Sequence, residues 1–427
     1  MLQQGEIIPS QLVPDLPTQI GGYAPQNYDR EFRGAVSTSE ALAQSLNIPA
    51  VRLVRQFGVD RFYDFLTGLG LTSLHRSPQQ YGLPIILGGA EISLWEIAAA
   101  YANLATISQN PQQKYYAKVS LLKDQNKSHG KATEIGAGAA WLTLKALLEV
   151  KRPGSDRFWK NFLSSQKIAW KTGTSYGLKD GWAIGITPKF TVAVWIGNAD
   201  GHGVPGLTGA SAAAPLMFSI FNLLPKSSWF ETPYQDLKQV VVCADDGFMS
   251  NGRCLEKTEL IPLKSHFSQL TPFHFQLHLD KETGLRVNSR CEKVRNMKSV
   301  NQFVLPPSIE FYYQRAHSKY QAIPEYRADC QSQSSSSGSP MAFIYPQKGT
   351  KVYVPIDLDG KPSQVIFEAV HRRHDAVIYW HLDDQYITAS KQFHQLAIDL
   401  DPGWHRITLV DEKGFRLTQN FKVLNPK

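Results

Sequence analysis

Hydrophobic and polar positions alternate most regularly between residues 168 and 196. Alternating apolar residues up to Trp170 run into Lys171-Thr172-Gly173-Thr174, a Tyr-Gly turn follows, and two further strand-like runs cover residues 182–186 and 190–196. Alternation with a period of two, interrupted by turn residues, is typical of neighbouring antiparallel strands. The pattern therefore predicts a strand backed by a meander in this part of the chain.

Helical patterns dominate the sequence before this meander. Residues 37–40 and 93–96 both read Ser-x-x-Glu, the pattern of a capping box in which Ser and Glu bond the first free N–H groups of a helix. The first box opens a short helix, Pro49 is placed to start a second helix that stops at Gly58, and the box at 93–96 opens a helix through Ala105. Further helices are predicted over residues 60–67, 134–150 and 210–224.

Strand patterns in the first half of the chain are few. Residues 1–36 show no sustained period and are rich in Pro, Gly and Gln, so they are predicted to form loop. Residues 115–122 alternate like a strand, and the other recognisable strands lie together late in the first 225 residues. This grouping predicts an α+β fold with an antiparallel sheet and helices.

The pattern changes after residue 225. Residues 226–330 contain short strand-like runs with frequent Pro and charged residues, and residues 331–340 are a Ser-rich sequence typical of a flexible linker. About seven short runs with turn signals follow in residues 341–427, which is the pattern of a small all-β, immunoglobulin-like sandwich. We predict four parts: a first domain over 1–225, a cysteine-bearing connector over 226–330, the linker, and the sandwich over 341–427.

Composition narrows the classes of function. The 427 residues are enough for two to three domains, and the formal charge of +8 is spread along the chain, without the interleaved basic and aromatic residues of a nucleic-acid surface. The most apolar stretch, residues 83–107, contains Glu91 and Glu96, so it is predicted to be a buried amphipathic helix with its approach rather than a membrane span. The N-terminus lacks the pattern of a secretion signal.

All four cysteines fall after residue 240, without the spacing of a zinc site. Two disulfides in an oxidising compartment and four buried thiols in a cytosolic protein both fit this pattern. The residues concerned are Cys243, Cys254, Cys291 and Cys330.

Two short motifs carry candidate chemistry. The predicted strand at 168–174 ends in Lys171-Thr172-Gly173-Thr174, which offers a cation, two hydroxyl groups and a glycine that lets a ligand approach the backbone. Such an edge can hold a carboxylate, although a surface hairpin without a ligand can have the same letters. Ser45-x-Asn47 places a hydroxyl and an amide at the corner between two predicted helices, where they either face a ligand or only cap the second helix.

The order and context of these motifs resemble the second and third active-site motifs of penicillin-recognising serine acyltransferases. The wider sequence is similar to the transpeptidase domain of class A penicillin-binding proteins, at residues 32–34, 40–42, 45–53, 87–91 and 98–101. The chain resembles one branch of that family more closely than the others. This resemblance lies in the connector, the terminal sandwich and three motifs, Trp-Lys-Thr-Gly-Thr-Ser-Tyr-Gly at 170–177, Asp-Gly-Trp-Ala at 180–183 and Pro-Gly-Leu-Thr-Gly-Ala at 205–210.

The resemblance implies a role in synthesis of the peptidoglycan cell wall. Family members cross-link D-Ala-D-Ala stem peptides through an acyl-serine, without a cofactor or metal, and take β-lactams as substrate mimics. Ser45 would relay a proton near the leaving amine and Asn47 would orient the stem peptide. Lys171 would add positive potential and bond Ser45, while Thr172 and Thr174 would grip the terminal carboxylate and the Thr174 N–H would supply half of the oxyanion hole.

The family's nucleophile is the serine of a Ser-x-x-Lys motif that precedes Ser-x-Asn, and nothing between Met1 and Ser45 fits it. Ser120-x-x-Lys123 and Ser164-x-x-Lys167 match the letters but not the context. We therefore expect the C-terminal portion of a bifunctional glycosyltransferase and transpeptidase, inactive alone, with an unpaired sheet edge that makes the first 225 residues marginally stable.

Two further expectations concern the setting of the chain. The alternative to an enzyme fragment is a non-catalytic envelope module that binds stem peptide or a cell-wall partner protein. The intact family works in the periplasm, anchored in the inner membrane, whereas no signal peptide or transmembrane segment is recognisable in this sequence.

Overall fold

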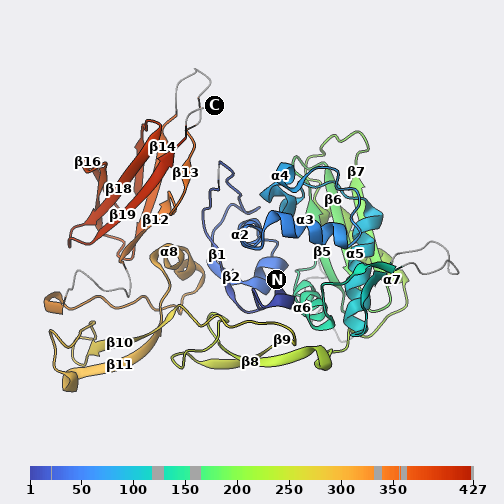
Figure 1. Ribbon diagram of the computed structural model, residues 1–427, viewed down its shortest axis with the longest axis horizontal. Helices are drawn as coiled ribbons and strands as arrows, with labels where there is room; N and C mark the ends of the chain where they lie inside the picture. Colours follow the sequence, from blue (N-terminus) through green and yellow to red (C-terminus); the bar gives the residue numbers. More distant parts are fainter. Residues whose placement is uncertain are drawn as a thin grey trace. The chain divides into compact units, whose positions relative to one another are not determined.

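The computed structural model describes residues 1–20, 22–117, 129–153, 165–330, 339–354, 356 and 363–424. The chain forms two compact units (Figure 1). The first consists of Met1–Val13, Ser37–Met249 and Glu256–Leu270, and the second of Pro14–Val36, Ser250–Leu255 and Thr271–Lys427. None of the helices in the described ranges is both long and apolar enough to cross a membrane.

Residues 1–36 are more ordered than their composition predicts. They contain a 3₁₀ turn, η1 (Leu2–Gln4), and two paired strands, β1 (Leu12–Asp15) and β2 (Gly34–Ser37), so the prediction of loop is wrong for these strands. The side chain of Asp15 is fully buried, and its carboxylate accepts hydrogen bonds from Asn27 Nδ2 at 2.8 Å and from the Arg33 backbone N–H at 3.1 Å. A buried polar contact of this kind leaves no periodic signal in the sequence.

Two helices of the first unit begin at the predicted capping residues Ser37 and Ser93. Ser37 Oγ accepts a hydrogen bond from the Glu40 N–H at 3.2 Å, and both halves of the capping box are present at Ser93 and Glu96. The second predicted helix does stop at Gly58 but starts two residues before Pro49. The helices are α1 (Thr38–Ala43), α2 (Asn47–Phe57), α3 (Val59–Gly68), α4 (Pro78–Tyr81), η2 (Leu83–Leu87), α5 (Leu94–Gln109), α6 (Ala137–Leu148), the π-helix η4 (Gly209–Ala213), α7 (Ala214–Leu223) and η5 (Tyr234–Asp236).

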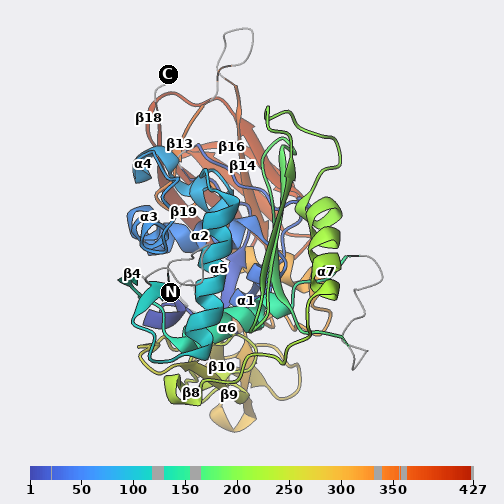
Figure 2. The ribbon, with the colours of Figure 1, turned by 90° about the vertical axis from the view of Figure 1, so that its right-hand side faces the viewer.

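The predicted meander is confirmed as an antiparallel sheet with the order β5-β6-β7. Its strands are β5 (Ala169–Thr174), β6 (Asp180–Ile186) and β7 (Thr191–Gly197). Helices α5 and α6 lie on one side of this sheet and α7 on the other (Figure 2). The side chain of Trp170 is 1% exposed and meets Phe218 of α7 edge to face at 5.0 Å, so β5 is anchored in the core.

Three smaller hairpins complete the strands before the sandwich. The strand predicted at 115–122 is present as β3 (Tyr115–Ala117), which pairs with β4 (His129–Ala132), and residues 118–122 lie outside the described ranges. The first unit also contains the pair β8 (Leu237–Cys243) and β9 (Glu256–Pro262). The second contains β10 (His274–Asp280), η6 (Val294–Asn296), β11 (Met297–Phe303), α8 (Pro307–Ala316) and η7 (Ala328–Cys330).

The prediction of an all-β part after residue 340 is confirmed. A three-stranded sheet with the order β12-β14-β17 and a five-stranded sheet with the order β13-β19-β18-β15-β16 enclose a core that contains the fully buried Phe367, Trp380 and Phe421. The strands are β12 (Met341–Tyr345), β13 (Lys351–Val352), β14 (Val365–His371), β15 (Val377–Leu382), β16 (Gln385–Lys391), β17 (His394–Ile398), β18 (Gly403–Asp411) and β19 (Arg416–Val423).

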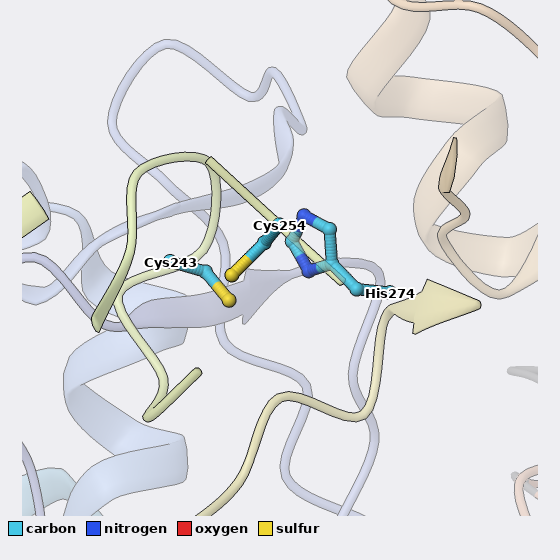
Figure 3. A group of neighbouring side chains, drawn as sticks. All are labelled: Cys243, Cys254 and His274. Atoms are coloured by element: carbon cyan, nitrogen blue, oxygen red, sulfur yellow. The ribbon is translucent and has the colours of Figure 1, made fainter. Parts of the chain in front are cut away.

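All four cysteines are oxidised. Cys291 forms a disulfide with Cys330, and Cys243 and Cys254 are disulfide-bonded as well. The structure therefore favours the oxidising-compartment alternative over four thiols. Figure 3 shows Cys243 and Cys254 with His274. Because both cysteines are oxidised, neither offers the thiolate with which cysteine binds a metal.

A buried histidine should make the stability of the sandwich depend on pH. His394 is 6% exposed and its Nδ1 lies 3.0 Å from Ser390 Oγ, and burial, with a smaller effect of His371, lowers the pKa of His394 to about 4. Between pH 6.5 and 4 the unfolded chain binds a proton at this position that the folded chain does not. The free energy of unfolding should therefore decrease as the pH is lowered through this interval, by up to about 1.4 kcal/mol per pH unit.

Urea unfolding of the full chain at pH 7 and pH 5 checks this, read by pulsed hydrogen exchange on peptides from residues 377–398. Between pH 7 and pH 5 the free energy of unfolding of the sandwich should fall by about 2 kcal/mol in the wild-type chain but not in the His394→Gln chain. Peptides from residues 169–186, in the first unit, should report the same free energy of unfolding in the two chains. An equal loss in the two chains would contradict the assignment to His394.

Candidate active site

A pocket of about 550 Å³ lies in the first unit and brings the two sequence motifs together. Its walls come from helix α1 and the turn that follows it, from the end of α6, and from β5. Ser45, Lys171 and Thr172 line it, together with Glu149 and Lys151. Asn47, Gly173 and Thr174 are not among the lining residues.

Strand geometry directs Lys171 toward this pocket. Successive side chains of a strand point to opposite faces, and Trp170 points into the core against α7, so Lys171 points to the face that α6 covers. Its Nζ donates hydrogen bonds to Ser45 Oγ at 2.7 Å and to the Thr172 backbone carbonyl at 2.8 Å. The Lys171–Ser45 bond implied by the family resemblance is thus present in the structure.

Burial changes the acidity of this lysine. Desolvation lowers the pKa of Lys171 from its ordinary value of 10.5 to about 8. At pH 7 about nine-tenths of the ammonium groups therefore stay charged. The pocket thus holds a positive charge with reduced hydration, in a wall that Glu40, Glu149 and Lys151 also line.

Ser45 occupies an unusual backbone position. Its φ is +58°, in the left-handed region, and it follows Gln44, the C-cap of α1. The Leu46 N–H bonds the Ala41 carbonyl at 2.9 Å and the Ser45 N–H bonds the Leu42 carbonyl at 3.1 Å. These two bonds are those of a Schellman motif, in which glycine is the usual residue at this position.

The Schellman turn decides between the two interpretations of Ser45. The N-cap of α2 is Leu46, which makes no side-chain cap bond, so Ser45 ends the first helix and does not cap the second. A serine that stands where glycine is favoured costs about 1–2 kcal/mol of backbone strain. Strain of this kind is often retained where a side chain is needed, and here the serine hydroxyl accepts the bond from Lys171.

The other predicted site residues lie beside the pocket. Asn47 is the first residue of α2 and is partly buried. Thr174 ends β5, and its Oγ1 accepts a hydrogen bond from the Gly209 N–H at 3.0 Å. A Cβ at Gly173 would come no closer than 3.5 Å to the Trp182 side chain, so no contact within the described chain requires glycine there.

Gly209 is a positioning residue that the sequence analysis missed. A Cβ on it would lie 2.3 Å from the Trp182 carbonyl oxygen and 2.5 Å from the Gly173 carbonyl oxygen, so only glycine lets η4 approach the end of β5. Its signal in the sequence was the Thr208-Gly-Ala-Ser211 pattern, which forms a complete capping box in the structure.

The Ser-x-x-Lys matches remain untested. Ser120 and Ser164 lie outside the described residues, and so does Ser128, the first residue of a third match, Ser128-His-Gly-Lys131, that the sequence analysis overlooked. The described part of the site therefore contains the Ser45 and Lys171 motifs and no assigned nucleophile.

Protein-family models assign the class of protein. The model of the penicillin binding protein transpeptidase domain matches residues 1–222, and that of the Penicillin-Binding Protein C-terminus Family matches residues 330–421. Because the first model matches more than half of the 427 residues, the chain belongs to the penicillin-binding protein transpeptidase family.

Individual relatives point to one branch. Penicillin-binding protein 1C of Escherichia coli strain K12 is 27% identical over 449 residues, which cover 98% of this chain and 54% of that protein. The expected resemblance to one branch is thus confirmed, and that branch is penicillin-binding protein 1C. This chain spans about half the length of that relative.

Two further matches cover less of the chain. Penicillin-binding protein 1B of Vibrio cholerae is 30% identical over 200 residues, which cover 45% of this chain and 24% of that protein. The crystal structure of penicillin-binding protein 1A from Haemophilus influenzae matches with a TM-score of 0.49 at 19% identity, over 63% of this chain and 47% of that one.

Two substitutions at Ser45 should separate backbone strain from the lost hydroxyl. Ser45→Gly and Ser45→Ala both remove the acceptor of the Lys171 bond, but only glycine relieves the left-handed conformation. The Ser45→Gly chain should therefore be about 1 kcal/mol more stable than the Ser45→Ala chain. Urea unfolding followed by hydrogen exchange on peptides from residues 38–57 measures this difference, and equal stabilities would refute the strain at this turn.

Proposed function

We propose that the first unit binds the D-Ala-D-Ala end of a peptidoglycan stem peptide beside Ser45, Lys171 and Thr172, as part of a D,D-transpeptidase that serves cell-wall synthesis. The observation that carries the proposal is the hydrogen bond from Lys171 Nζ to Ser45 Oγ in the wall of the pocket. Family membership supports a stem peptide as the substrate class, and the pocket supports the position at which it binds.

The predicted site residues of β5 have roles suited to this ligand. The charged ammonium of Lys171 attracts the terminal carboxylate, and Thr172, another residue of the pocket wall, would donate its hydroxyl to that carboxylate at the edge of β5. Thr174 Oγ1 accepts one hydrogen bond from the Gly209 N–H, so its own proton stays available for the same carboxylate. Since nothing within the described chain requires glycine at 173, close approach of the ligand backbone accounts for it.

Ser45 and Asn47 would act on the scissile end of the peptide. The Ser45 hydroxyl, held by Lys171, can pass a proton between the ammonium and a leaving amine. Asn47 begins α2 two residues later and offers an amide to orient the peptide. The backbone N–H of Thr174 would provide one donor to the oxyanion.

Acyl transfer additionally needs a nucleophile. No Ser-x-x-Lys precedes Ser45 in this sequence, as the order of motifs in the family requires. In a comparable serine acyl-transfer site, loss of the nucleophile lowers turnover on the order of a millionfold. We therefore propose that this polypeptide by itself binds stem peptide without forming an acyl-serine.

A second candidate function is a non-catalytic envelope module that presents the same pocket to stem peptide or the sandwich to a partner protein. The oxidised state of all four cysteines supports a periplasmic setting for either candidate. Both agree with a division into a transpeptidase part over 1–225, a connector over 226–330, a linker over 331–340 and a sandwich over 341–427.

Binding of an acyl-D-Ala-D-Ala peptide tests the proposed pocket. Removing the hydroxyl of Thr172 with the isosteric valine should raise the dissociation constant about tenfold, because a hydrogen bond to a charged group is lost. The Thr172→Ser chain, which keeps the hydroxyl, should bind within about threefold of wild type. Isothermal titration of the full chain measures all three.

Two results would count against the proposal. The first is an unmeasurable affinity in wild type, and the second is an equal affinity of the Val and Ser variants. As a control for acylation, the chain is incubated with a reactive penicillin and its intact mass is read under denaturing conditions. The mass should not change, and an added drug molecule would show that a serine of this chain does attack.

A further inference from the structure

The sandwich carries a second hollow, of about 390 Å³, that the proposed function does not use. It belongs entirely to the second unit and is formed by the turn between β15 and β16 together with the start of β18 and the end of β19. Its lining residues are Asp383, Asp384, Trp404, His405, Arg406 and Asn420.

Trp404 gives this hollow a flat apolar wall. The residue is 72% exposed, an unusual position for the largest side chain, and it stands second in β18. Trp404 and Arg406 are two positions apart on β18 and therefore share a face, and Asn420 of β19 lies opposite Arg406 in the register. Arg406 and Asn420 therefore lie beside the indole on one surface of the sheet, and Lys422 lies directly opposite Trp404 in the register.

The polar wall is held in place by its own hydrogen bonds. Asp383 Oδ1 accepts from the Arg406 backbone N–H at 2.8 Å, and Asp383 Oδ2 lies 2.7 Å from His405 Nδ1. The other ring nitrogen, His405 Nε2, lies 2.8 Å from the Asp401 carbonyl oxygen, and Arg406 forms an ion pair with Asp384. A frame fixed before a ligand arrives reduces the ordering cost of binding.

The charges of the hollow select against ionic ligands. Asp384 is paired with Arg406, and Asp383 is bonded to the His405 ring and the Arg406 N–H, so a free ion would have to displace partners that these carboxylates already have. What remains is a neutral ligand with an apolar face for the indole and many hydroxyl or amide groups for the Asp, Arg and Asn side chains. A pyranose ring has this chemistry, because its axial C–H groups form an apolar face and its hydroxyls project around the rim.

We propose that this hollow is a saccharide-binding site, in which a pyranose ring stacks on Trp404 while Asp384, Arg406 and Asn420 bond its hydroxyl and acetamido groups. The glycan we expect is an oligomer of β-linked N-acetylglucosamine, a choice that rests on the proposed function at peptidoglycan. Binding of a sugar as such rests only on the geometry of the hollow.

Titration of the full chain with chitohexaose tests this site. The wild-type chain should bind it, and Trp404→Ala should weaken the binding at least about tenfold, because the substitution removes the flat apolar surface on which the ring is proposed to stack. Phe393→Ala is the matched control, since Phe393 is an 82% exposed aromatic residue of the same unit outside the hollow, and its affinity should stay within about twofold of wild type.

Three outcomes would overturn the proposal or a part of it. The proposed site would be refuted if the wild-type chain bound neither chitohexaose nor cellohexaose. It would also be refuted if the Trp404→Ala and Phe393→Ala variants lost the same amount of affinity. Binding of cellohexaose as tight as that of chitohexaose would remove only the choice of an N-acetylated sugar. If the chain binds acyl-D-Ala-D-Ala but no glycan, the saccharide site is refuted while the proposed stem-peptide pocket stands.

Discussion

The hydrogen bond from Lys171 Nζ to Ser45 Oγ, 2.7 Å long, is the contact on which the candidate site depends. It joins a helix end to a strand that lies 126 residues later, and each side is fixed by its own local structure. The Schellman turn holds Ser45, and the buried indole of Trp170 sets the direction of β5. The bond therefore brings the two motifs together in the wall of one pocket.

Each partner of this bond occupies a position that costs folding free energy. Ser45 has a left-handed backbone in which glycine would be favoured, and Lys171 keeps a charge where burial lowers its pKa to about 8. Functional sites commonly retain such costs because the surrounding core is stable enough to hold them. The sheet core around Leu144, Ile186 and Met217, all fully buried, provides that support.

Local patterns made much of this architecture predictable. The meander, the capped helices and the sandwich follow from alternation, capping boxes and turn residues, which act over a few positions. The β1–β2 pair was missed because the buried carboxylate of Asp15 fixes its surroundings through Asn27 and Arg33. No short-range pattern of apolar residues marks a contact of that kind.

The motifs of the site were likewise visible, whereas its geometry was not. The sequence also allowed Ser45 to be interpreted as a cap for α2, since only the backbone bonds show that it ends α1. The Trp404 hollow could not be predicted either, because Asp384, Arg406 and Asn420 come from separate segments and meet only through the register of β18 and β19.

Titration of Lys171 by NMR of the ¹³C-dimethylated full chain, assigned with Lys171→Arg, tests the central claim most directly. The free chain should show a midpoint near pH 8. Saturating acyl-D-Ala-D-Ala should move the midpoint upward, because a carboxylate beside the ammonium stabilises its charged form. A midpoint that stays unchanged with saturating peptide would show that the carboxylate binds elsewhere and would contradict the account.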